Sequence, residues 1–138
     1  LPISALVYKK LPFNPAKDFA PVTQMTITPL VLITGANVPA KSVKDLVDLA
    51  KKSPGKVTFA SSGPGTSHQL SGELFKTLAG IDILHVPYKG SAPAHIDLMS
   101  GTVDLMFDNI VPVTPHIKSG KLKALAVTTK TRASTLPE

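Results

Sequence analysis

The sequence contains no cysteine, and aromatic residues make up only 5% of its 138 positions. The absence of cysteine excludes disulfides, thiol nucleophiles and thiolate metal sites within the chain. No apolar run is long enough to span a bilayer. The first residues, LPISALVYKK, lack the basic start and the apolar core of a secretory signal. A mature protein or an excised domain would also lack such a signal, so the compartment stays open at this point.

Acidic residues are scarce as well, with 9 Asp and Glu against 15 Lys and Arg and a net charge of +6. The basic residues are scattered over the ends of the predicted elements and are not interleaved with aromatics, which argues against a nucleic-acid partner. The histidines fall in different predicted elements without the spacing of metal ligands, at His68, His85, His95 and His116. The sequence therefore predicts neither a metal site nor another cofactor.

The chain has enough apolar residues, 43% of the total, for one compact domain with a core. After an irregular stretch over residues 1–21, the segment FAPVTQMTITPLVLITG contains two β-like runs that are broken at Pro29. The next segment, SVKDLVDLAKKSPG, predicts a helix. Ser42 and Asp45 have the spacing of a capping box at the start of this helix.

From residue 57 onward, short apolar runs alternate with helical patterns. The runs cover residues 57–60, 83–86, 103–107 and 122–127, and the helices cover residues 66–78, 92–99 and about 115–118. This order predicts an α/β fold with a mostly parallel mixed sheet flanked by helices. The apolar runs do not alternate strictly, as expected for strands that are covered on both faces. No internal boundary is visible, so residues 1–138 are interpreted as a single α/β domain.

Polar residues gather where three of the predicted strands end. These junctions read SSGPGTSH from residue 61, PYKGS from residue 87, and Asp108 followed by Asn109. The opposite ends of the strands are plain turns, such as KSPGK and MSGT. Ligands of open α/β sheets bind beyond the carboxyl ends of the strands. We therefore expect the three junctions to form one polar edge that binds a ligand.

The first junction leads into the N-terminus of a predicted helix, where free backbone N–H groups and the helix dipole favour an anion. Gly63 and Gly65 let the backbone approach a ligand closely, and Ser61, Ser62 and Thr66 add hydroxyl donors. The alternative is a tight turn in which Thr66 only caps its own helix. The loop is neither a P-loop nor a complete dinucleotide fingerprint.

The other two junctions offer a phenol and an ammonium from Tyr88 and Lys89, and a carboxylate from Asp108. Each has an ordinary alternative, in which Tyr88 packs on the surface, Lys89 is solvated and Asp108 caps the next turn. A hydrolase triad could be drawn from Ser62, His68 and Asp108, but no G-x-S-x-G elbow is present. We therefore predict a ligand-binding domain without catalytic residues. The alternative is an enzyme that acts on a small anionic substrate at the same edge.

Four segments together resemble the Bug-type receptors, the periplasmic substrate-binding proteins of tripartite tricarboxylate transporters. The segments are KDFAPVTQM, SSGPGTSHQLSGELF, HVPYKGSAPAHIDLMSG and GKLKALAVTTKTRASTLPE, in the order typical of the family and over essentially the whole chain. One departure is Gln69, which stands between His68 and Leu70 where the family runs His-Leu directly. This departure could shift the start of the helix by one residue.

The resemblance implies a receptor of two α/β domains that closes on a small organic carboxylate or amino acid in the periplasm. Residues 1–138 would then be one lobe of a type II periplasmic-binding-protein fold, the second domain without the first. Membrane transporter subunits would be the partners of the whole receptor. The family's ligand contacts carry over to Ser61, Ser62, Gly65, Thr66, His68, Tyr88, Lys89, Gly90 and Asp108. A lone lobe is expected to bind its ligand weakly, and its exposed apolar surface leaves dimerisation or strand exchange open.

Overall fold

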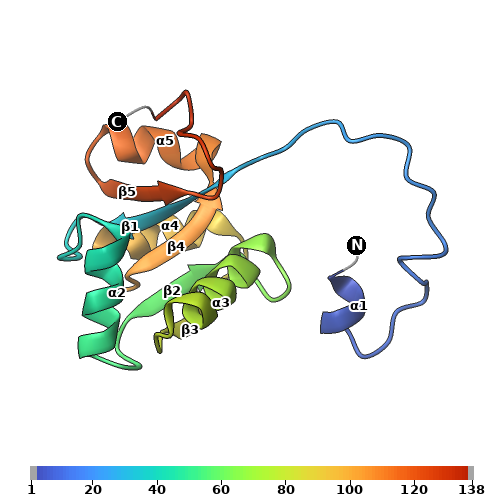
Figure 1. Cartoon of the computed structure of the whole chain (residues 1–138), viewed down its shortest axis with the longest axis horizontal. Helices are drawn as coiled ribbons and strands as arrows, with labels where there is room; N and C mark the ends of the chain where they lie inside the picture. The colour runs from blue at the N-terminus through green and yellow to red at the C-terminus, as the bar shows by residue number, and fades with distance from the viewer. Residues whose placement is uncertain (1–2, 137–138) are drawn as a thin grey trace.

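The computed structural model describes residues 3–136 and contains a five-stranded sheet between two layers of helices (Figure 1). The strands lie in the order β3-β2-β4-β1-β5. Their bounds are β1 Leu30–Gly35, β2 Thr58–Ser61, β3 Leu84–Pro87, β4 Leu105–Asn109 and β5 Leu122–Val127. β2 pairs in parallel with β3 and β4, whereas β1 runs antiparallel to β4 and β5. The predicted α/β class with a mixed, mostly parallel sheet is confirmed, since only β1 of the described strands runs against the others.

Helices cover both faces of this sheet. They are α2 Val43–Lys52, α3 Ser67–Ala79, α4 Ser91–Ser100 and α5 Ile110–Lys118. A short helix, α1 Ser4–Val7, lies apart from the sheet within the stretch that was predicted to be irregular (Figure 1). The neighbouring residues Phe59 and Ala60 of β2 face opposite cores, one beneath α2 and α3 and one beneath α4 and α5. Burial on both faces explains why the apolar runs of the sequence are continuous. None of the helices within residues 3–136 is long and apolar enough to cross a membrane.

The starts of α2 and α3 are set by the local sequence, as predicted. Ser42 Oγ accepts a hydrogen bond from the backbone N–H of Asp45 at 3.1 Å. Thr66 Oγ1 accepts one from the backbone N–H of Gln69 at 3.4 Å. Each hydroxyl satisfies an N–H group that has no partner inside its own helix. The first turn of α3 therefore begins directly after the polar loop that follows β2.

Gly72 determines how closely α3 lies against β2. A Cβ atom at Gly72 would lie 2.3 Å from the ring of Phe59. Phe59 has no exposed surface, and its ring stacks on His85 of β3 with the ring centroids 4.8 Å apart. The missing side chain at position 72 therefore lets the helix approach the sheet and sets the position of its N-terminus.

Two predictions of secondary structure are wrong. The run before Pro29 is not a strand, because residues 19–28 are exposed and belong to no helix or strand. A strand needs a partner, and in Figure 1 this segment runs away from the described sheet. The helix predicted near residues 115–118 begins earlier, at Ile110. Pro112 does not prevent this, because it lies in the first turn, where a backbone N–H has no partner within the helix.

Candidate functional site

The three polar junctions meet at one edge of the sheet, as predicted, because β2, β3 and β4 are parallel neighbours. The backbone N–H of Tyr88, after β3, donates to the carbonyl oxygen of Ser61 at 2.9 Å. The hydroxyl of Ser91, at the start of α4, donates to Oδ1 of Asp108 at 3.4 Å. These contacts join the ends of the three strands into a single surface.

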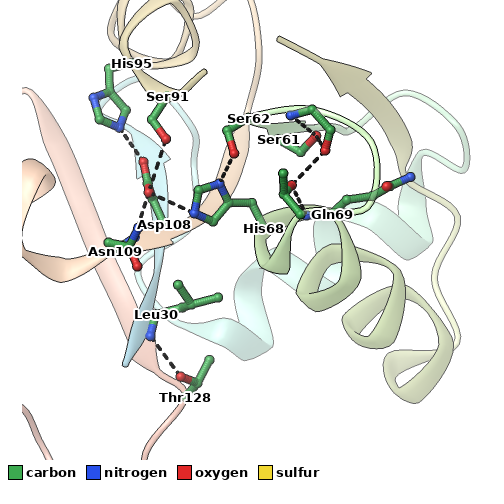
Figure 2. A network of polar contacts seen from close by, with 12 residues as sticks. Leu30, Ser61, Ser62, His68, Gln69, Ser91, His95, Asp108, Asn109 and Thr128 are labelled. Atoms are coloured by element: carbon green, nitrogen blue, oxygen red, sulfur yellow. Dashed lines mark hydrogen bonds and ion pairs between the residues drawn. The ribbon is translucent and has the colours of Figure 1, made fainter. Parts of the chain in front are cut away.

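Asp108 lies at the centre of this edge and has no exposed surface. His95 Nε2 of α4 lies 2.6 Å from its Oδ2, and the backbone N–H of Asn109 donates to its Oδ1 at 2.6 Å. His68 Nε2 of α3 lies 3.2 Å from Oδ1 (Figure 2). Burial alone would raise the pKa of Asp108, but the hydrogen bonds from His95 and Asn109 and the nearby histidines lower it below its usual value. Asp108 is therefore a buried carboxylate.

His68 connects this carboxylate to the loop after β2. Its Nδ1 lies 2.6 Å from Ser62 Oγ, while its Nε2 faces Asp108 (Figure 2). Burial lowers the pKa of His68 against the opposing effect of Asp108, so the ring is neutral at about pH 7. Ser62, His68 and Asp108 thus have the connectivity of the triad that the sequence alone allowed.

The remaining polar groups of the loop bind one another. Thr66 Oγ1 donates to the carbonyl oxygen of Gly63 at 2.7 Å in addition to capping α3. The backbone N–H of Gly65 donates to Gln69 Oε1 at 2.7 Å. The capping alternative for Thr66 is therefore realised, and the donors of Thr66 and Gly65 are engaged within the loop. These hydrogen bonds hold the loop in one shape.

Ser61 and His85 support the loop from within the sheet. Ser61 is fully buried, and its Oγ lies 2.7 Å from His85 Nε2. Gln69 Nε2 lies 3.4 Å from the other ring nitrogen of His85. Gln69, the residue that departs from the family pattern, therefore ties the loop to β3. Burial lowers the pKa of His85, which keeps its ring neutral in this network.

The second junction points its groups in different directions. The hydroxyl of Tyr88 donates to Asp97 of α4 at 2.6 Å, and burial together with this hydrogen bond raises the pKa of Tyr88 to about 12. Lys89 is exposed. Gly90 is the N-cap of α4, and its φ of 107° is a conformation that favours glycine. The phenol is thus held by α4, whereas the ammonium of Lys89 remains at the surface.

Three helices begin at this edge, since α3, α4 and α5 follow β2, β3 and β4. Neither Gly90 nor Asn109 caps its helix with a side-chain hydrogen bond, so the first turns of α4 and α5 keep N–H groups for other partners. Free N–H groups and helix dipoles at helix N-termini favour anions. Hollows of about 690 Å³ beside residues 5–16, about 270 Å³ beside β5 and about 870 Å³ between α5 and residues 134–136 are lined by residues other than those of the three junctions. Pro64, Ser67 and Lys89 are exposed, so the edge is open to solvent.

Sequence reasoning missed His95, which holds the central carboxylate. A signal was present, because His95 lies in a predicted helix four residues after Ser91, and residues at this spacing share a face once the helix includes both. Both contact Asp108 in the structure. The predicted residues Ser62, His68 and Asp108 are brought together, whereas the Tyr88 hydroxyl and Ser61 are engaged elsewhere.

The family described as the tripartite tricarboxylate transporter family receptor, TctC, matches residues 3–138. A UPF0065 protein from the tcbD-tcbE intergenic region of Pseudomonas sp. (strain P51) is 37% identical over 138 residues, 100% of this chain and 41% of that protein. Protein BugT of Bordetella pertussis is 35% identical over 137 residues, 99% of this chain and 42% of that protein. The chain thus spans about two fifths of the length of these relatives.

Solved structures share the fold. R. palustris Rpa4515 with adipate is 40% identical, with a TM-score of 0.83 over 91% of this chain and 42% of its own. MatC (Rpa3494) from Rhodopseudomonas palustris with bound malate is 30% identical, with a TM-score of 0.87 over 98% of this chain and 46% of its own. The periplasmic binding protein BugD is 39% identical, with a TM-score of 0.76 over 80% of this chain and 37% of its own. This chain corresponds to less than half of each structure.

Proposed function

Because the chain belongs to the tripartite tricarboxylate transporter receptor family, we propose that it forms one lobe of a periplasmic receptor for a small organic carboxylate. The family and the solved neighbours are solute-binding receptors, and two of these neighbours hold adipate and malate. The observation that carries the proposal is the convergence of the α3, α4 and α5 N-termini at one open polar edge. This edge forms one wall of a ligand cleft, and a first domain outside this chain forms the other.

In this proposal the predicted residues divide into three groups. Ser62, Lys89 and the N–H groups in the first turn of α4 face the ligand in this proposal, since Ser62 and Lys89 are not buried and Gly90 supplies no side-chain cap to that turn. The N–H of Gly90 itself donates to the carbonyl oxygen of Ser62 at 3.3 Å. His68 and Asp108 are buried and hold Ser62 in place. The remaining predicted residues, Ser61, Gly65, Thr66 and Tyr88, shape the loops through the internal hydrogen bonds described above.

The proposed mechanism is closure of two lobes around the ligand. The carboxylate contacts both walls in the closed form and only one wall in the open form, so it shifts the equilibrium towards the closed form. The closed receptor then delivers its ligand to the membrane subunits of the transporter. Residues 1–138 supply one wall only, and the ligand loses the contacts of the other.

We expect the 138-residue chain to bind adipate with a dissociation constant in the millimolar range or weaker, about 4 kcal/mol of binding free energy. The measurement is the saturation of amide shifts in an NMR titration. Hexanediol, which has the same carbon chain without charges, serves as the control and should cause no saturable shift. Micromolar binding of adipate would contradict the one-wall account. Equal responses to adipate and hexanediol would contradict recognition of a carboxylate.

A further inference from the structure

The hydroxyl proton of Ser62 is already engaged in the protein without ligand. The Asp108 carboxylate only accepts hydrogen bonds, and it lies 3.2 Å from His68 Nε2. A lone pair on Nε2 would be repelled at this distance, so the neutral ring carries its proton on Nε2. Nδ1 is then an acceptor, and the short 2.6 Å contact requires Ser62 to donate its proton to it.

This arrangement conflicts with recognition of a carboxylate. Ser62 presents only oxygen lone pairs to a ligand while its proton points at His68. A ligand carboxylate also presents only lone pairs, so the two groups cannot hydrogen-bond to each other. Protonation of His68 at Nδ1 removes the conflict, because Nδ1–H then donates to Ser62 Oγ and the serine proton turns to the ligand.

We propose that a ligand carboxylate binds at Ser62 together with one proton, which the His68 ring takes up from solvent at Nδ1. This inference rests on the proposed function, since it concerns the same edge and the same class of ligand. The ring then lies as an imidazolium between two carboxylates, that of Asp108 on one side and that of the ligand beyond Ser62 on the other. Each carboxylate favours the charged ring.

The surroundings of His68 allow this charge in the complex and oppose it in the free protein. Asp108 of β4 favours the charged ring, whereas burial and His95 of α4 disfavour it. The ring of His116 of α5 lies 5.8 Å from that of His95, which in turn contacts Asp108. The neighbouring junction carries one exposed cation, Lys89. The negative charge that tips the balance is therefore that of the ligand.

The first test needs no ligand. Long-range ¹H–¹⁵N correlation spectra distinguish the two neutral tautomers of each histidine, and substitution of single histidines assigns the signals. In the free protein at about pH 7.5 we expect His68 to be neutral with its proton on Nε2. A proton on Nδ1 of the neutral ring would leave the Ser62 hydroxyl free to donate and would overturn the inference.

The second test adds saturating adipate and follows the same signals with pH. We expect His68 to become protonated at both nitrogens, and the affinity for adipate to rise as the pH falls from about 8 to about 6. The rise approaches about tenfold per pH unit for one coupled proton. Saturable binding of adipate with His68 still neutral would refute proton uptake and leave the proposed function standing. No saturable binding at any pH would overturn both.

Matched variants locate the proton. His68→Gln should abolish the pH dependence between about pH 8 and about pH 6 because the titrating ring is gone. His116→Gln, on α5, should keep the pH dependence of the parent. Each variant's amide spectrum shows whether it folds. A pH dependence that persists in folded His68→Gln would place the proton elsewhere and refute the inference.

Discussion

Replacing Asp108 by alanine is expected to lower the free energy of unfolding by about 3–5 kcal/mol, because several hydrogen-bond donors packed around it lose their acceptor and each unsatisfied group costs about 1–3 kcal/mol. Asp108 accepts from the ring of His95, the hydroxyl of Ser91 and the backbone N–H of Asn109, and it has no exposed surface. Alanine leaves these donors buried without their acceptor. Urea unfolding followed by circular dichroism measures the loss.

The size of this loss depends on the burial of the carboxylate. Replacing a carboxylate at the surface by alanine tests this dependence. Asp48 pairs with Lys44 at 2.6 Å, but both side chains are largely exposed, at 48% and 83%. Water replaces the partner when an exposed pair is broken, so Asp48→Ala should leave the urea midpoint almost unchanged. If Asp108→Ala were as stable as Asp48→Ala, Asp108 would not be the buried centre of the edge.

Adding a single methyl group at Gly72 is the second change with a large expected effect. Gly72→Ala should lower the free energy of unfolding by about 1–3 kcal/mol, the range typical of an overpacked core. The new Cβ would lie 2.3 Å from the Phe59 ring, and that ring is fully buried and stacked on His85. The ring therefore has little room to move away.

Two effects compete at this position, and their relative sizes decide whether Gly72→Ala raises or lowers the free energy of unfolding. Alanine favours a helix interior over glycine by about 1 kcal/mol, which would stabilise α3 if space were available. We expect the clash to outweigh this gain. The double mutant with Phe59→Leu tests the cause, because the smaller side chain should make Gly72→Ala less costly than in the parent.

Leu78→Ala provides the control for the same helix. Leu78 is 78% exposed, so its truncation should change the free energy of unfolding by no more than about 0.5 kcal/mol. If Gly72→Ala stabilised the protein as helix propensity alone predicts, the close approach of α3 to β2 would be wrong.

Much of the fold could be predicted because its signals are local. The capping box at Ser42 and Asp45 and the cap at Thr66 operate within a single turn, and both occur as expected. The alternation of apolar runs and helices also predicted that β2, β3 and β4 end at one edge. Parallel neighbours place their following loops together whatever the details of packing.

The errors arose where contacts between distant parts of the chain determine the local structure. Residues 19–28 have a β-like composition, but composition does not supply the partner strand that a sheet requires. The helix was predicted only near residues 115–118, whereas α5 begins at Ile110. Pro112 lies in its first turn and removes no helical hydrogen bond, while Pro115 lies inside the helix, so the tertiary packing of α5 outweighs the local signal. The direction of the Tyr88 hydroxyl depended on Asp97, which no local pattern links to it.

The sequence predicted the location of the candidate site better than the hydrogen bonds within it. The sequence indicated that polar residues gather at the strand ends, but it did not show which donors are already engaged. Thr66 and Gly65 bind their own loop, and His95 holds Asp108 from the opposite layer of helices. Such pairings depend on distances between elements that are far apart in the chain.

The central claim is that a carboxylate binds at the ends of β2, β3 and β4. An assigned ¹H–¹⁵N map recorded during titration with adipate tests it most directly. We expect the saturable shifts to concentrate on the backbone amides from Ser62 to His68 and around Gly90 and Asn109. Saturable shifts that fall instead on residues 5–16 or 124–136, beside the hollows described above, with the strand ends unchanged, would contradict the claim.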